Sequence, residues 1–256
     1  MKVLLQYLKT ITVMMFTVLS LQAQNFSADE IMKKNDLLLK PKDAYSEITL
    51  TLTDKNNNKI RRKLISYTMK TGLGYNSYFE VTAPADIAGM KLLSIAQKGE
   101  DEQRMYLPAF GKIRKISSAG KTGKFLGSDI YFYDLEDHDF NDFTYQTVVT
   151  ENWNEKKYFV IASIPKDKKA PYSKIINYVN ADDYFIYKSE MCDRRGQLLK
   201  TLVVNDTKII KNIIVPTEIS YKNVKTKHST YYRVDVIKIN SGISTAIFTI
   251  KSLEEE

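Results

Sequence analysis

The sequence has little of the chemistry from which disulfides, metal sites and catalytic centres are built. It contains one cysteine and two histidines in 256 residues. The single cysteine, Cys192, has no internal partner, so the fold must be stable through packing alone. Only His138 and His228 could act as a general base, and no nucleophile, acid and base set can be assembled around them. The sequence therefore predicts a protein that is not an enzyme and holds no metal or cofactor.

Missing residues also argue against a phosphate-binding loop and against a metal site. Gly120-Lys121-Thr122 resembles the end of a phosphate-binding loop, but that motif needs a glycine five positions earlier, where Lys115 stands. The acidic residues between Asp134 and Asp142 do not have the spacing of a calcium loop, and His138 has no second histidine nearby. We interpret these acids as a solvated face, and we expect His228 to be exposed in a polar turn.

No apolar run is long enough to span a bilayer, for which about 20 residues are needed. The apolar residues Ile11–Leu21 follow Lys2 and Lys9 and lead into Leu21-Gln22-Ala23, a small-residue cleavage pattern. This arrangement predicts a secretory signal peptide, residues 1–23, that is removed after Ala23. We therefore expect a periplasmic protein, with an uncleaved anchor as the alternative.

The remaining residues, 24–256, are expected to form a single domain, because no linker rich in Pro, Gly or Ser and no repeat divides them. The formal net charge of +8 falls to +6 when Lys2 and Lys9 are removed with the signal peptide. Such a charge favours transient contact with an anionic membrane surface. Nucleic acid is not expected as a partner, because the cations are scattered among acids rather than gathered on one element.

Hydrophobic periodicity predicts a mainly β fold with one helix near the N-terminus. Ser27 and Glu30 have the spacing of a capping box, and apolar residues then recur near helical spacing, which predicts a helix over Ala28–Leu39. From Tyr45 the period changes to two, and about a dozen short strands with hairpin-like turns follow. This pattern favours a single curved antiparallel sheet with one wet face over a parallel α/β design.

One stretch, Met105–Leu135, departs from this pattern. It carries large apolar and aromatic residues between glycines, although a glycine-rich loop is usually polar. Such a segment is either pinned on a hydrophobic surface or covers one. The N-terminal helix and Gly120–Leu135 are the two candidate lids, and a short helix is predicted over Ser128–Asp137, with Ser128 as its cap.

The same stretch resembles a known protein family in the order and spacing of its blocks. The blocks are Phe79–Gly89, Leu107-Pro108-Ala109-Phe110, Arg114-Lys115-Ile116, Phe125-Leu126-Gly127-Ser128-Asp129 and Tyr133-Asp134-Leu135. They resemble the outer-membrane lipoprotein-sorting-protein-like family, which is related to the periplasmic lipoprotein carriers. The resemblance spans most of the chain after Gln24. It implies an unclosed barrel, with a hydrophobic cavity for acyl chains on the concave side of a curved sheet.

Candidate site residues follow from this resemblance and from the composition of the segment. The candidates for the cavity or its lid are Ile31, Leu38, Leu107, Phe110, Phe125, Leu126, Tyr131, Phe132 and Tyr133. The candidates for a hinge are Gly123 and Gly127. The candidates for contact with lipid head groups are Arg114, Lys115, Lys121 and Lys124, and the alternative for these four is simple solvation of a strand and loop.

The function predicted from the sequence is that of an exported carrier or binding protein. It would shelter the acyl chains of a lipid or lipoprotein and serve lipid or lipoprotein sorting in outer-membrane biogenesis. The alternative is an accessory protein that docks on an inner-membrane lipid transporter and carries no lipid itself.

Overall fold

The computed structural model describes residues 26–255, so the predicted signal peptide lies outside the described residues. Within this range the chain forms one helix and thirteen strands of a single sheet. The helix, α1, spans Ala28–Asp36. The strands are β1 (Asp43–Thr53), β2 (Lys59–Lys70), β3 (Tyr75–Ala83), β4 (Lys91–Ile95), β5 (Glu102–Leu107), β6 (Lys112–Lys115), β7 (Phe143–Trp153), β8 (Lys156–Pro165), β9 (Lys174–Asn180), β10 (Ile186–Cys192), β11 (Leu198–Ile210), β12 (Ile213–Asn223) and β13 (Ser229–Ile239).

Seven short 3₁₀ helices connect these elements. They are η1 (Pro108–Phe110), η2 (Ser118–Thr122), η3 (Phe125–Gly127), η4 (Phe132–Leu135), η5 (Phe140–Asp142), η6 (Thr245–Ile247) and η7 (Lys251–Leu253). No helix within residues 26–255 has both the length and the apolar character that crossing a bilayer requires.

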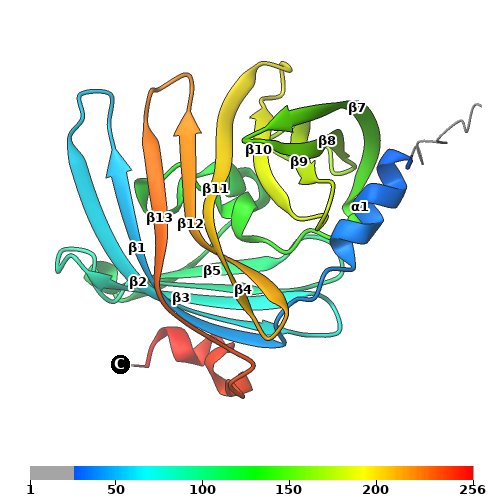
Figure 1. The fold of residues 1–256 in the computed structure, drawn as a ribbon. Helices are drawn as coiled ribbons and strands as arrows, with labels where there is room; N and C mark the ends of the chain where they lie inside the picture. Colours follow the sequence, from blue (N-terminus) through cyan, green and yellow to red (C-terminus); the bar gives the residue numbers. More distant parts are fainter. Residues whose placement is uncertain (1–25, 256) are drawn as a thin grey trace, which may run out of the picture.

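The strand order makes the sheet an almost complete circuit. It runs β6-β5-β4-β3-β2-β1-β13-β12-β11-β10-β9-β8-β7, and each neighbouring pair is antiparallel. The two edge strands, β6 and β7, are consecutive in the sequence, yet they do not pair with each other. The sheet therefore curls strongly without closing, as Figure 1 shows. The predicted fold, a single curved antiparallel sheet that forms an unclosed barrel, is confirmed.

β1 shows how the sequence gives the sheet two different faces. Successive side chains of a strand point to opposite sides. Ile48, Leu50 and Leu52 are buried on the concave side, whereas Thr49 and Thr51 alternate with them and face the outer side. The apolar residues of one face are thus covered while the other face stays polar.

The chain between the two edge strands covers the concave side of β1–β5. We call residues 116–142 the plug; Figure 1 shows it in green inside the curve of the sheet. Its apolar side chains form one cluster with those of the sheet. The buried members are Ile48, Leu50, Leu52, Leu64, Val81, Leu92, Phe125, Leu126, Ile130 and Phe132.

α1 covers the concave side of the other half of the sheet. The predicted capping box is present: the Ser27 hydroxyl accepts from the Glu30 N–H at 3.2 Å, and the Glu30 carboxylate accepts from the Ser27 N–H at 2.7 Å. Ile31 and Met32 are buried in a cluster with Ile161 of β8 and Val179 of β9.

The helix is shorter than the sequence predicts. It ends at Asp36 and is capped by Leu37, whereas the predicted end was Leu39. Leu37 and Leu39 are both largely exposed. Their apolar side chains have no sheet surface to cover, so packing does not extend the helix to them.

The C-terminal segment packs on the outer face of the sheet, where Figure 1 shows it in red. Phe248 and Leu253 are buried there against Tyr78 of β3 and Leu93 of β4. The outer face of β3 and β4 is therefore part of a second core.

Candidate functional site

A buried cation ties the plug to the far half of the sheet. Lys200 of β11 is fully buried, with 0% of its surface exposed. Its ammonium donates to the Asp134 carboxylate at 2.5 Å and to the carbonyl of Asp129 at 2.7 Å, and it lies 4.1 Å from the centre of the Tyr131 ring. Burial lowers the pKa of Lys200, and the charge of Asp134 opposes this shift.

Asp129 makes a second anchor between the plug and the sheet. Its carboxylate is fully buried, accepts from the hydroxyl of Thr230 on β13 at 2.9 Å, and lies 2.7 Å from Nδ1 of His228. Its N–H donates to the same threonine oxygen at 2.9 Å. The prediction that His228 is exposed is wrong, because only 18% of its side chain is accessible beside this carboxylate.

The acids that follow the plug's aromatic residues are not all solvated, as the sequence suggested. Asp134 accepts from Lys200 and from the Tyr172 hydroxyl, the latter at 2.7 Å. Glu136 is ion-paired with Lys121, and burial raises the pKa of the Glu136 carboxyl. The interpretation as a solvated face is therefore wrong for these two residues.

Three of the predicted lid residues lie in the core. Phe125 and Phe132 contact each other edge to face, with ring centres 6.1 Å apart, and Phe125 lies 5.6 Å from the Phe79 ring of β3. Leu126 completes this packing, and a space of only about 10 Å³ is left between the plug and the sheet here. The concave side of β1–β5 is thus filled by the protein's own side chains.

The remaining cavity candidates are distributed over several places. Tyr131 and Tyr133 pack in a separate cluster with Tyr172. Ile31 is buried on the side of α1 that faces the sheet, whereas Leu38, beyond the helix, and Leu107, on β5, are half-buried.

Phe110 is 65% exposed and lies outside the cavity, because η1 turns it onto the surface, where the Arg114 guanidinium lies 5.9 Å from its ring centre. Its assignment to the cavity is corrected accordingly.

The four head-group candidates are divided by burial. Arg114, Lys115 and Lys124 are exposed. Lys121 is only 5% exposed, because its ammonium is taken up by Glu136, by Glu100 at 3.5 Å and by the carbonyl of Asp101 at 3.2 Å. Lys121 is therefore a structural residue of the plug and is removed from the head-group candidates.

The two hinge candidates occupy tightly constrained positions. Gly127 has a φ of +71° and follows Leu126 at +51°, so the chain passes through two successive left-handed residues. A Cβ on Gly123 would lie 2.9 Å from the carbonyl oxygen of Gly120. These positions explain why glycine is needed there, and a hinge role stays a prediction.

The short helix predicted over Ser128–Asp137 is wrong. The Ser128 hydroxyl donates to the Phe125 carbonyl at 2.6 Å and accepts from the Ile130 N–H at 3.1 Å, but these bonds close a tight turn and no α-helix follows it. Only Phe132–Leu135 forms a 3₁₀ turn within that range.

An opening on the concave side lies beneath α1. It is a hollow of about 240 Å³ between the helix and β7–β10. Its apolar walls are formed by Met32, Phe140, Phe143, Ile175, Ile186 and Met191. Its polar side includes Asp36, Lys40, His138 and Asp139.

Buried polar groups in the hollow are satisfied by one another. Asn177 donates to the Ser163 hydroxyl at 2.9 Å and accepts from the Ser189 hydroxyl at 2.7 Å. This chain of hydrogen bonds runs across β8, β9 and β10, so these groups need no ligand to be paired. The sequence contains no local signal for the hollow, because its residues come from five separate stretches of the chain.

Asp101, in the turn before β5, provides a pH test of the plug's surroundings. Its carboxylate is buried and accepts from the N–H of Asp137 at 3.3 Å, and burial raises its pKa. The folded protein therefore binds a proton here more tightly than the unfolded chain, so this group adds stability as the pH falls through the raised pKa. From neutral pH to about pH 4, we expect the unfolding free energy of the wild type to gain on that of Asp101→Asn.

Urea denaturation of both proteins at each pH measures this difference. A difference that is constant over the whole range would contradict the raised pKa of Asp101.

Within residues 26–255, no group of three or more His, Cys, Asp and Glu side chains is placed to hold a metal ion.

Comparison with solved structures finds the same fold in three bacterial proteins. A putative outer membrane lipoprotein-sorting protein domain from Vibrio parahaemolyticus is 24% identical with a TM-score of 0.85, covering 89% of this chain and 98% of that one. A DUF1329 family protein from Desulfovibrio piger is 22% identical with a TM-score of 0.84, covering 88% and 97%. A LolA superfamily protein from Nitrosomonas europaea is 20% identical with a TM-score of 0.72, covering 89% and 99%.

A family model described as "-like: Uncharacterized protein" matches residues 74–255, well over half of the chain. The chain belongs to this family. The predicted resemblance to the outer-membrane lipoprotein-sorting-protein-like family is confirmed. No curated protein matches this chain.

Proposed function

We propose that this lipoprotein-sorting-protein-like chain is a periplasmic carrier or binding protein that shelters an acyl chain of a lipid or lipoprotein under α1. The hollow beneath the helix carries the proposal, because its walls are apolar and one side is polar. An acyl chain in water costs about 0.8 kcal/mol per CH₂, so a binding protein must offer a dry surface of similar character. The apolar walls would meet the tail, and the polar side would face the head group.

The contacts of the two covering segments favour α1 as the movable one. α1 buries only Ala28, Ile31 and Met32. Two of its side chains bond the loop before β10: Lys34 donates to the Tyr184 hydroxyl at 2.9 Å, and Asn35 donates to the Tyr184 carbonyl at 2.8 Å. A cover that must admit and release cargo is drawn from the less strongly held parts of a structure.

The plug is held more strongly, through buried charges that contact two strands on the far side. Lys200 reaches it from β11, and Thr230 reaches it from β13. Displacing the plug would break these contacts and uncover the cluster around Phe125. We therefore assign the plug a fixed role in forming the inner surface, and the exposed Arg114, Lys115 and Lys124 a contact with anionic head groups at a membrane surface.

Filling the hollow tests the proposal. Ile186 lines it on β10, and Ile186→Trp adds bulk where the tail would lie. We expect this variant to bind a fluorescent fatty acid at least about tenfold more weakly, while overpacking costs about 1–3 kcal/mol of stability. Ile209→Trp is the matched control, because Ile209 is 75% exposed on β11. Probe titration and thermal melts of both variants give the measurement.

Lipid that co-purifies with the wild type, identified by mass spectrometry of organic extracts, would support the same proposal. Wild-type protein that neither binds the probe nor yields lipid would overturn it. Isolation of that lipid-free protein with a stoichiometric inner-membrane transporter would favour the alternative, an accessory protein that carries no lipid.

A further inference from the structure

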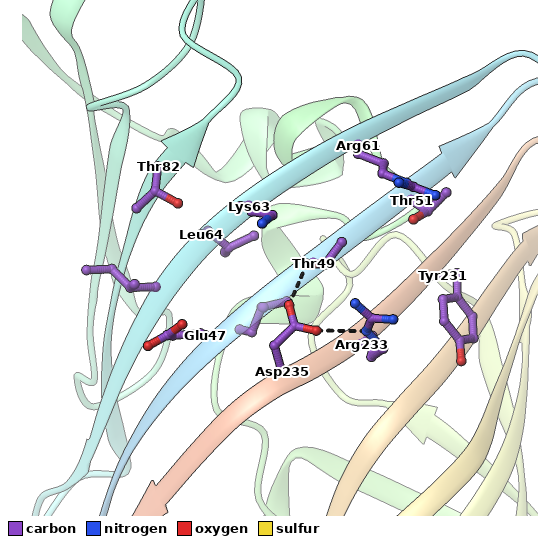
Figure 2. A pocket seen from close by; sticks show the side chains of 12 residues that line it. Glu47, Thr49, Thr51, Arg61, Lys63, Leu64, Thr82, Tyr231, Arg233 and Asp235 are labelled. Atoms are coloured by element: carbon purple, nitrogen blue, oxygen red, sulfur yellow. Dashed lines mark hydrogen bonds and ion pairs between the residues drawn. The ribbon is translucent and has the colours of Figure 1, made fainter.

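A second hollow lies on the outer face of the sheet, away from the plug and α1. It has a volume of about 640 Å³ and crosses β3, β2, β1 and β13. We call it the outer groove; Figure 2 shows the side chains that line it. Arg61 and Lys63 contribute from β2, and Arg233 and Asp235 contribute from β13. Thr49, 8% exposed, lies between them on β1.

Two irregularities of the sheet meet at the outer groove. The pairing of β1 with β13 shifts register between Glu47 and Ile48. The pairing of β2 with β3 shifts between Lys63 and Leu64, and Leu64 is the partner of Ile48 across β1 and β2. Bulges bend strands, re-aim side chains and occur preferentially next to functional sites. Because both register shifts fall on neighbouring strands, the shape of this part of the outer face differs from that of a regular sheet surface.

Three cations, Arg61, Lys63 and Arg233, and two carboxylates, Glu47 and Asp235, line the groove. Asp235 is already engaged, because it accepts from the Thr49 hydroxyl at 2.5 Å and from Nε of Arg233 at 2.8 Å. This contact uses Nε of Arg233 and fixes the direction of the side chain, and no hydrogen bond found within residues 26–255 engages the two terminal nitrogens. The Glu47 carboxylate accepts from the Tyr45 hydroxyl at 3.0 Å.

Arg61 and Lys63 stand on the same face of β2, two residues apart, and take part in none of the ion pairs found within residues 26–255. The register carries Lys63 across Thr49 to Arg233, so the three cations border one hollow from opposite sides. Two arginine guanidinium groups and one lysine ammonium supply charged N–H donors, from which phosphate oxygens accept hydrogen bonds.

We propose that the outer groove binds a phosphate ester, with Arg61, Lys63 and Arg233 holding the phosphate oxygens. The phosphate could belong to a soluble ester or to a lipid head group, and both present the same chemistry to these donors. This site is independent of the acyl cavity, because the pleat places its side chains on the opposite face of the sheet. Failure of either proposal therefore leaves the other standing.

The test measures binding of glycerol 3-phosphate by calorimetry and of vesicles containing phosphatidylglycerol by co-sedimentation. Arg61→Gln with Lys63→Gln should weaken binding about tenfold or more, since two charge-assisted contacts are lost. Asp235→Asn should strengthen it, because this change removes the carboxylate that is paired with Arg233. Lys157→Gln with Lys208→Gln removes two exposed strand lysines outside the groove and is the charge-matched control.

The four proteins separate the possible outcomes. Binding of the soluble ester that follows this order supports the groove as a phosphate-ester site, and binding of vesicles alone in the same order assigns the phosphate to a lipid. Equal weakening in the groove variant and the control would overturn the proposal, because it would indicate attraction to net charge alone. Absence of wild-type binding to both probes would also overturn it. The fluorescent fatty acid should bind the groove variant as it binds the wild type.

Discussion

The Lys200→Met variant is expected to lose about 3–5 kcal/mol of unfolding free energy, since removing one partner leaves the largely buried Asp134 carboxylate without its countercharge. Lys200 is fully buried, and the Asp134 carboxylate that it contacts at 2.5 Å is 14% exposed. Methionine fills the volume of the lysine stem but cannot donate to Asp134 or to the Asp129 carbonyl. Urea denaturation followed by circular dichroism measures the loss.

A second variant separates charge from packing. Lys200→Met combined with Asp134→Asn removes both charges, so the double variant should be more stable than Lys200→Met alone. Lys208→Met is the control on the same strand, because Lys208 is exposed and its replacement should change stability by no more than about 0.5 kcal/mol. If the loss of unfolding free energy in the double variant equals the sum of the losses in Lys200→Met and Asp134→Asn, the ion pair does not anchor the plug as we describe.

Phe125→Ala is the other change with a large expected effect, a loss of about 3–5 kcal/mol as for other buried aromatic side chains. Phe125 is 4% exposed and packs against Phe79 and Phe132. Because the side chain belongs to the core under β1–β5, the folded variant should still bind the fluorescent fatty acid with wild-type affinity. Thermal melts beside probe titration at a temperature where the variant is folded provide the comparison.

The matched control is Phe110→Ala, since Phe110 is 65% exposed and its removal should be almost neutral for stability. Much weaker probe binding by folded Phe125→Ala, with stability close to that of the wild type, would contradict this prediction. The Gly120–Leu135 segment would then move with the cargo, and α1 would not be the cover.

The parts of the fold that depend on local pattern could be predicted from the sequence. Alternation of apolar residues with threonines identified β1, and the Ser27 and Glu30 pair identified the start of α1. The family resemblance supplied the unclosed sheet. These signals are local or depend on fixed motif spacing, so they can be recognised without the tertiary structure.

The anchors of the plug could not be predicted because their partners are far apart in the sequence. Lys200 and Asp134 are separated by 66 positions, and His228 and Asp129 are separated by 99. A lysine is rarely buried unless it is paired, so Lys200 gives no sign of its position until the sheet brings the carboxylate to it. The outer groove could not be predicted for a related reason, because register shifts between strands leave no pattern in the residues.

The strand order described above also sets the order in which the molecule can assemble. Every neighbouring strand pair is joined by a short stretch of chain except β1 with β13, which brings Ala44 to Ile239. Pairs close in sequence form early, and a contact across nearly the whole chain must overcome a large loop-closure entropy. Thr230 and Lys200, which hold the plug, lie in the C-terminal half. A newly synthesised chain can therefore form hairpins from either half, but it can complete its interior only after its last strand has been made.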